Sequence, residues 1–156
     1  MGQREAGSIQ ICFHYAEILN NEAKSRLKSL FVYAAKVGRK DIIQVLAPFV
    51  GNANARENTW KHSPIGAAIT NGNTEIIELL APLCNDYKYN GSFPNPTNGS
   101  LIHLAAFSEQ AEAIKIIAPF MKNPNANFGF EFTPLELARR WWGPNHDVTR
   151  TLETLQ

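Results

Sequence analysis

One nine-residue pattern occurs three times in this sequence, and it constrains the fold more than any other feature. The copies at 41–49, 75–83 and 112–120 each begin with an acidic residue, continue with apolar residues and contain an Ala-Pro pair. A fourth, more diverged copy begins at Asp147. Alanines precede the four copies at Ala34, Ala68, Ala105 and Ala138. These alanines are 34, 37 and 33 residues apart, a period typical of helix–turn–helix solenoids.

Helix start and stop signals recur in the same register. Ser63 and Thr133 are each followed by proline, which places an N-cap oxygen before a proline at the first helical position. Gly38 and Gly72 occupy the position where a helix ends in the left-handed conformation. Glu109 occupies that position in the third unit, so we expect this turn to be less stable or differently shaped.

The second helix of each unit contains a proline in the same register. The three prolines are Pro48, Pro82 and Pro119. Proline cannot donate a backbone hydrogen bond in mid-helix, so we expect each of these helices to end or bend there.

These residues carry a specific resemblance to the ankyrin-repeat family. The family's Thr-Pro-Leu-His-x-Ala signature is matched at 63–68, 100–106 and 133–138, and Asn-Ala pairs follow the outer helices at Asn54 and Asn125. The resemblance implies an all-α solenoid with short hairpin-like fingers. It covers residues 29–155 as four repeats near 29–62, 63–99, 100–132 and 133–155, within a single domain of residues 1–156.

A capping region is expected at 8–28, because the ends of a solenoid must be covered. Within it, residues 8–20 form an expected helix whose apolar face consists of Ile9, Cys12, Phe13, Ala16 and Leu19. Residues 25–37 are the expected first inner helix. Its inward residues are predicted to be Leu27, Leu30, Phe31 and Ala34. At the other end, Val148 and Leu152 are predicted to face inward.

Composition and motifs give no support for an enzyme, a metal site or a cofactor. The formal charge is +1, and the two cysteines are too few for a disulfide framework, which favours a cytoplasmic or nuclear protein. The histidines have no metal-ligand spacing, and no phosphate loop or nucleophile elbow is recognisable. Cys84 is interpreted as a partly buried structural thiol. For His103, the resemblance implies a hydrogen bond within its own turn.

A solenoid offers a concave surface built from its fingers and inner helices, where aromatic residues and arginines supply most binding energy. The finger candidates are Trp60, Lys61, Tyr87, Tyr89, Phe93, Phe128 and Phe130. The inner-helix candidates are Lys36, Thr70, Asn71, Phe107, Arg140 and Trp141. Alternating phenylalanines at 128–132 predict a strand-like finger with Phe132 inward and Phe128 or Phe130 exposed. The insertion at 86–99 is either a long finger that contacts a partner or a loop without a binding role.

The resemblance implies a protein–protein interaction module, an adaptor or a stoichiometric inhibitor of a partner protein that the sequence does not identify. We expect it to act as a monomer, and no apolar run approaches the length of a membrane span, so we expect no membrane partner. Short inhibitors of Rel-type transcription factors or of kinases are the nearest analogy within the family. The alternative from another class is nucleic-acid binding. It would use a C-terminal patch of Arg139, Arg140, Trp141 and Trp142 for backbone contact and base stacking. Arg139, however, takes a position that the repeat predicts to be largely inward.

Overall fold

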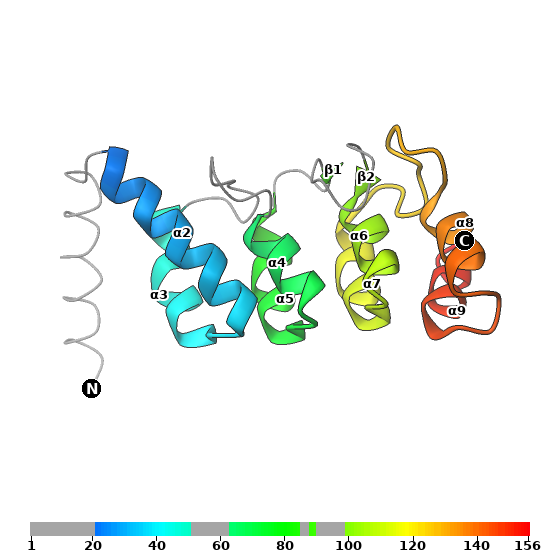
Figure 1. Ribbon diagram of the computed structural model, residues 1–156, viewed down its shortest axis with the longest axis horizontal. Helices are drawn as coiled ribbons and strands as arrows, with labels where there is room; N and C mark the ends of the chain where they lie inside the picture. The colour runs from blue at the N-terminus through cyan, green and yellow to red at the C-terminus, as the bar shows by residue number, and fades with distance from the viewer. Residues whose placement is uncertain (1–20, 51–62, 85–87, 90–98) are drawn as a thin grey trace.

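The computed structural model describes residues 21–50, 63–84, 88–89 and 99–156. Four helix pairs stand side by side in sequence order (Figure 1). The inner helices are α2 (Asn21–Val37), α4 (Pro64–Thr70), α6 (Leu101–Phe107) and α8 (Pro134–Trp141). The outer helices are α3 (Lys40–Val50), α5 (Thr74–Leu80), α7 (Ala111–Ile117) and α9 (Asp147–Glu153). Each helix packs on its partner and on the same helix of the neighbouring unit, which confirms the predicted all-α solenoid.

The inner helices begin where the N-cap signals predict. The Ser63 hydroxyl accepts a hydrogen bond from the Gly66 backbone N–H at 3.2 Å. Thr133 and Glu136 form a reciprocal capping box, in which the Thr133 N–H donates to the Glu136 carboxylate at 2.8 Å. These bonds satisfy backbone donors that the first turn of a helix leaves without an internal partner.

Small and branched apolar residues fill the space between units. Ala34, Ala68, Ala105 and Ala138, the alanines that define the period, are all 0% exposed. Because alanine has only a methyl group, adjacent inner helices approach closely at this level of the stack. Ile77, Ile114 and Leu152 are equally buried on the outer helices, so the core runs continuously between the two rows.

The turn between inner and outer helix has one shape in the first three units. Gly38 and Gly72 have positive φ angles of 74° and 67°, and Glu109 has a positive φ of 58°. In each turn the next residue donates its N–H back to the equivalent alanine carbonyl, at 2.9–3.0 Å. The expectation of a different shape at Glu109 is therefore wrong, and reduced stability of this turn stays a prediction.

The outer-helix prolines act differently in different units. α5 ends at Leu80 and α7 at Ile117, and each continues as a 3-10 turn that contains the proline, η1 (Ala81–Leu83) and η2 (Ala118–Phe120). α3 instead runs through Pro48 to Val50. The prediction that each outer helix ends or bends at the proline is thus confirmed for α5 and α7, which end there, whereas α3 does not end there.

The first unit departs from the sequence prediction in two respects. α2 begins at Asn21, earlier than residue 25. Phe31 and Ala34 are buried as predicted and Leu27 is half-buried, but Leu30 is 44% exposed, so its inward assignment is wrong. The capping helix expected at 8–20 lies outside the described residues. Val148 and Leu152 at the other end are both 0% exposed, as predicted.

The described fingers contain little strand. β1 (Lys88–Tyr89) pairs antiparallel with β2 (Gly99–Ser100), with Lys88 opposite Ser100. Residues 122–132 contain turns and bends and no strand, so the prediction of a strand-like finger at 128–132 is wrong. Phe128 and Gly129 both have positive φ, as in a type I′ turn, and Phe130 donates its N–H to the Asn127 carbonyl at 2.7 Å. In the described part of the chain, no helix is long and apolar enough to cross a membrane.

Candidate functional site

The C-terminal ends of the inner helices, together with the residues that cap two of them, form a row along the inner-helix side of the stack. In the first three units they directly follow a fully buried residue, Ala35, Ile69 or Ala106. Along the row these residues are Lys36 and Val37, Thr70 and Asn71, Phe107 and Ser108, and Arg140 and Trp141. The first two units contribute only polar or aliphatic side chains to this row, whereas each of the last two contributes one aromatic side chain, Phe107 or Trp141.

Thr70 and Asn71 use their donors within their own helix. The Thr70 hydroxyl lies 3.1 Å from the carbonyl oxygens of Gly66 and Ala67. The Asn71 side-chain amide donates to the Ala67 carbonyl at 2.8 Å. These two candidates therefore form a small polar surface that lies flat on α4.

Phe107 and Trp141 form an aromatic pair across the third and fourth units. Their ring centroids are 5.3 Å apart with the planes tilted by 58°, a favourable arrangement for two aromatic side chains. Phe107 is half-buried and packs against the core, whereas Trp141 is 56% exposed. The structure thus brings together two residues that lie on different helices and were predicted separately.

Arg140 extends this aromatic pair toward the finger before α8. Its guanidinium carbon lies 5.1 Å from the centroid of the Phe132 ring, within cation–π distance. Arg140 is exposed and Phe132 half-buried. We call Phe107, Trp141, Arg140 and Phe132 the aromatic surface. Sequence reasoning had assigned Phe132 only to the interior and missed its place under Arg140.

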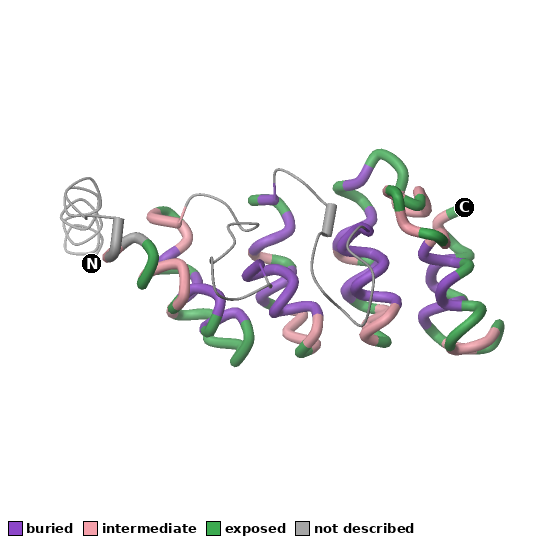
Figure 2. The backbone as a smooth tube through the Cα atoms, turned by 45° about the horizontal axis from the view of Figure 1, so that its top comes forward, coloured by how far each residue is buried: buried purple, intermediate pink, exposed green. Residues whose placement is uncertain are grey.

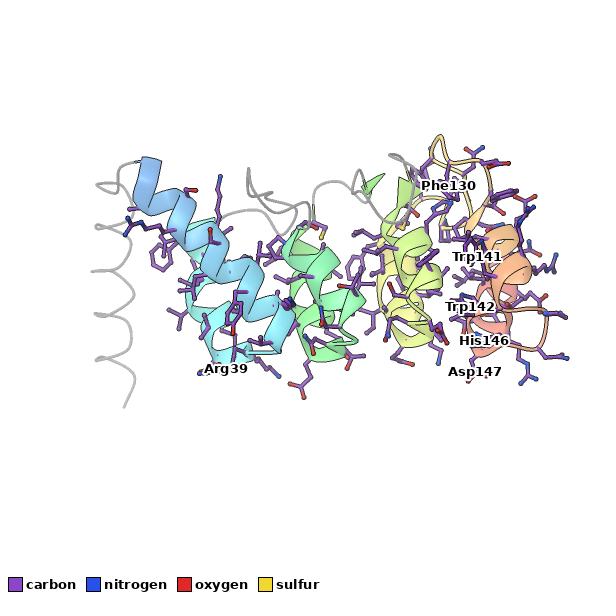
Figure 3. All side chains as sticks on the ribbon, viewed as in Figure 1. Arg39, Phe130, Trp141, Trp142, His146 and Asp147 are labelled. Atoms are coloured by element: carbon purple, nitrogen blue, oxygen red, sulfur yellow. The ribbon has the colours of Figure 1, made fainter. Side chains whose placement is uncertain are left out.

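Phe130 has a structural position that the sequence did not predict. It is half-buried, with its ring edge-on to His103 at 5.1 Å and to Phe132 at 6.3 Å. Figure 3 shows Phe130 at the finger side of the last helix pair, beyond Trp141 and Trp142. The expectation that Phe128 or Phe130 is exposed is wrong, because both rings pack against the core.

His103 connects two units through its imidazole ring. Nδ1 accepts from the Ser100 backbone N–H at 3.1 Å, so the proton lies on Nε2, which donates to the Phe132 carbonyl at 2.8 Å. Burial lowers the pKa of His103, and the bond to Phe132 opposes this shift. The local bond is the one that the resemblance implied. The bond to Phe132 fastens the following finger onto the third unit.

Trp142 and Arg139 do not contribute to an exposed basic patch. The Trp142 indole N–H donates to the Ala106 carbonyl at 2.8 Å, and its half-buried ring stacks on His146. Arg139 is exposed, which corrects its inward assignment, and pairs with Glu153 at 2.8 Å. The patch required for the nucleic-acid alternative is therefore reduced to Arg140 and Trp141.

Cys84 is a buried thiol with a local hydrogen bond. Its Sγ donates to the Leu80 carbonyl at 3.3 Å, and burial raises its pKa to about 12. A thiol with so high a pKa stays protonated and is a poor nucleophile at neutral pH. The structural interpretation is supported. The described residues contain no group of three or more His, Cys, Asp or Glu side chains that could hold a metal ion.

The remaining candidates cannot be placed. Trp60, Lys61, Tyr87 and Phe93 lie outside the described residues, as does Cys12. Tyr89 belongs to β1, where only the backbone is described.

The repeat geometry agrees with a comparison against known protein families. A family model described as ankyrin repeats (3 copies) matches residues 30–128. This chain belongs to the ankyrin-repeat family. The fourth helix pair, α8 and α9, follows the matched range in the same register. A search of curated proteins found no match. Ankyrin repeats are helical solenoids that generally serve as protein–protein interaction modules, so the family implies protein partners.

Proposed function

We propose that this ankyrin-repeat protein binds a partner protein through the aromatic surface and acts by occupying it, as an adaptor or a stoichiometric inhibitor. The observation that carries the proposal is the Phe107–Trp141 pair, in which a tryptophan in contact with a neighbouring ring remains 56% exposed. Tryptophan and arginine are the residue types most enriched among binding hot spots.

The exposed part of Trp141 leaves substantial free energy for a partner. An aromatic side chain buries about 200 Å², so covering half of one is worth roughly 2–3 kcal/mol at about 25 cal/mol per Å². Arg140 adds a guanidinium whose orientation is constrained by the Phe132 ring. A pre-positioned side chain loses less conformational freedom on binding, which favours affinity.

A short stack that binds through its inner face can act by covering a functional surface of another protein. By analogy with short ankyrin inhibitors, a Rel-type transcription factor is one such target. We propose that this protein acts as a monomer in the cytoplasm or the nucleus.

The proposal is tested by identifying a partner through affinity capture and mass spectrometry, and then measuring its Kd for single variants. Trp141→Ala should weaken binding by about tenfold or more, equivalent to about 1.4 kcal/mol, with the melting temperature nearly unchanged. Phe107→Ala should weaken binding too, with a moderate loss of stability because Phe107 packs against the core. Phe120→Ala is the matched control, since Phe120 is an aromatic residue that is 45% exposed at the end of η2, the turn that follows α7.

Equal weakening by Phe120→Ala and Trp141→Ala would show that the aromatic surface is not the binding site. Unfolding of Trp141→Ala by several kcal/mol would contradict its assignment as a surface residue.

A further inference from the structure

The end of the described stack that begins with α2 and α3 exposes apolar residues that later units bury. Tyr33 on α2 occupies the register position of Ala67, Leu104 and Leu137. Those three residues are 3–4% exposed, whereas Tyr33 is 61% exposed. Leu30 likewise occupies the position of the buried Leu101 and is 44% exposed. The first unit differs from the others in having no described helix pair before it, so we infer that these positions form its end face.

The outer helix of the first unit shows the same difference. Val45 on α3 is 62% exposed, whereas Leu79 and Ile116 in the same register are half-buried and Thr151 is 9% exposed. Leu30, Tyr33 and Val45 therefore define one surface across α2 and α3, which we call the N-terminal end face.

The opposite end of the stack is polar at positions that the inner units bury. Arg139 on α8 occupies the register position of Ala35, Ile69 and Ala106, all 0% exposed. On α9, Glu153 occupies the position of Ala81 and Ala118, which are 0% and 5% exposed. Arg139 and Glu153 pair with each other at 2.8 Å. A solenoid needs a polar outer face on its terminal units, and this end already has one.

We propose that residues 8–20 of this chain cover the N-terminal end face as an amphipathic helix. The apolar side chains Ile9, Phe13 and Ala16 recur at helical spacing, and Gln10, His14 and Glu17 recur on another face. The inference stands independently of the proposed binding function.

The length of the segment fits this occupant. Residues 8–20 are enough for one helix but too few for another unit of about 33 residues. A helix over 8–20 would be about 20 Å long, the same as residues 21–33 of α2. If the proposed helix ends before Asn20 and the chain turns back there, at a residue type that favours turns, the two helices run side by side as far as Tyr33.

Cys12 provides a direct test, because it lies on the apolar side of the segment. The full chain carrying Cys84→Ala has Cys12 as its one thiol, and its rate of reaction with a water-soluble thiol reagent is measured in buffer and in urea. We expect reaction at least about tenfold slower in buffer, at a rate independent of protein concentration. Tyr33→Glu should restore the rate to near the urea value. Gln44→Glu is the matched control, since Gln44 is exposed on α3 and its equivalents in all later units are exposed too.

Three outcomes would overturn the proposal. The first is reaction of Cys12 in buffer as fast as in urea. The second is protection that grows with protein concentration together with a dimer in sedimentation, which would make a second copy the occupant. The third is protection that Tyr33→Glu leaves unchanged. Circular dichroism verifies that each variant is folded, and Val45→Glu replaces Tyr33→Glu if the latter unfolds.

Discussion

At the scale of single residues, Glu109 shows that the repeat tolerates a residue whose intrinsic preference disfavours the conformation that the turn requires. The equivalent turns use Gly38 and Gly72, but Glu109 adopts the same left-handed conformation with a φ of 58°. A residue with a Cβ pays about 1–2 kcal/mol for this conformation. The Glu109 carboxylate lies 3.6 Å from His146 Nε2 on the next unit, an exposed contact that offsets little of this cost.

Glu109→Gly should raise the free energy of unfolding by about 1 kcal/mol, because glycine adopts positive φ without steric cost. Chemical denaturation measures the change. Glu109→Ala is the control, since it removes the same carboxylate and keeps the Cβ. If the alanine variant gains as much as the glycine variant, backbone strain is not the cause.

His103 should make stability depend on pH near neutrality. Its folded-state pKa is lowered below the ordinary 6.5, so the unfolded chain binds more protons in this range. The stabilisation is complete above about pH 6.5 and is lost as the pH falls through the folded-state pKa. We expect the melting temperature to drop between pH 7.5 and pH 5.

His103→Gln keeps a hydrogen-bond donor and an acceptor but does not titrate in this range. It should be less stable at pH 7.5, and its melting temperature should fall less between pH 7.5 and pH 5. Asp41, with a pKa lowered to about 2, and Glu136, whose pKa is also lowered, affect the pH dependence of stability only at more acidic pH. A drop between pH 7.5 and pH 5 of the same size in His103→Gln would refute the role of this ring.

Residues with local partners were predictable from the sequence, and those with distant partners were not. The bond of His103 to Ser100 spans three residues and follows from the signature, but its bond to Phe132 spans 29 residues and depends on the finger's path. Arg139 was assigned inward because its register position is buried in inner units. In the last unit no following helix pair is described, so the same position is exposed.

At the scale of elements, successive units are joined at the N-termini of the outer helices. Asn73 stands directly before α5, and its side-chain amide donates to the carbonyls of Ala35 and Lys36 at the end of α2, at 2.8 and 2.9 Å. Gln110 holds the same position before α7 and lies against Gly72, where an added Cβ would be 3.0 Å from Gln110 Oε1. Each side chain thus contacts the turn of the preceding unit.

Asn73→Ala should lower the free energy of unfolding by about 1–2 kcal/mol, because two carbonyls at the end of α2 lose their donor. Asn73→Asp should cost at least as much, since its carboxylate would face the negative end of the α2 dipole. Denaturant titration of both variants measures the effect. Asn71→Ala is the control, because the Asn71 amide donates to Ala67 and Thr70 of its own unit. Equal losses for Asn71→Ala and Asn73→Ala would contradict a coupling role.

Helix starts could be predicted because caps are local signals, whereas the finger before α8 could not. Alternating phenylalanines predicted a strand, but the turn from Asn127 to Phe130 has its own hydrogen bonds and positive φ angles at Phe128 and Gly129. Local turn geometry therefore outweighed the alternation. The inter-unit contact of Asn73 was not predictable, because it joins residues 37 and 38 positions apart, and Gln110 stands at the same position before α7.

At the scale of the whole molecule, each unit packs mainly against the adjacent units among the described residues, so the central units are covered on both sides. α4 and α6 are buried over nearly their full length, whereas α2 and α8 each have an exposed side (Figure 2). The period predicted the order of the units. It did not predict which side chains are exposed at the ends, because that depends on whether another unit lies beside them.

Trp142 should control how strongly the fourth unit is held to the third, since its indole N–H reaches the Ala106 carbonyl at 2.8 Å and its ring packs against the core. In Trp142→Ala, hydrogen exchange of the α8 and α9 amides should accelerate by about tenfold or more while α4 and α5 change little, because solenoid units are stabilised mainly by their neighbours. Trp141→Ala removes the adjacent, mostly exposed indole and should leave the exchange of all four helices nearly unchanged. Equal acceleration across α4, α5, α8 and α9 in Trp142→Ala would mean that the units open together, and nearest-neighbour coupling would then not describe this stack.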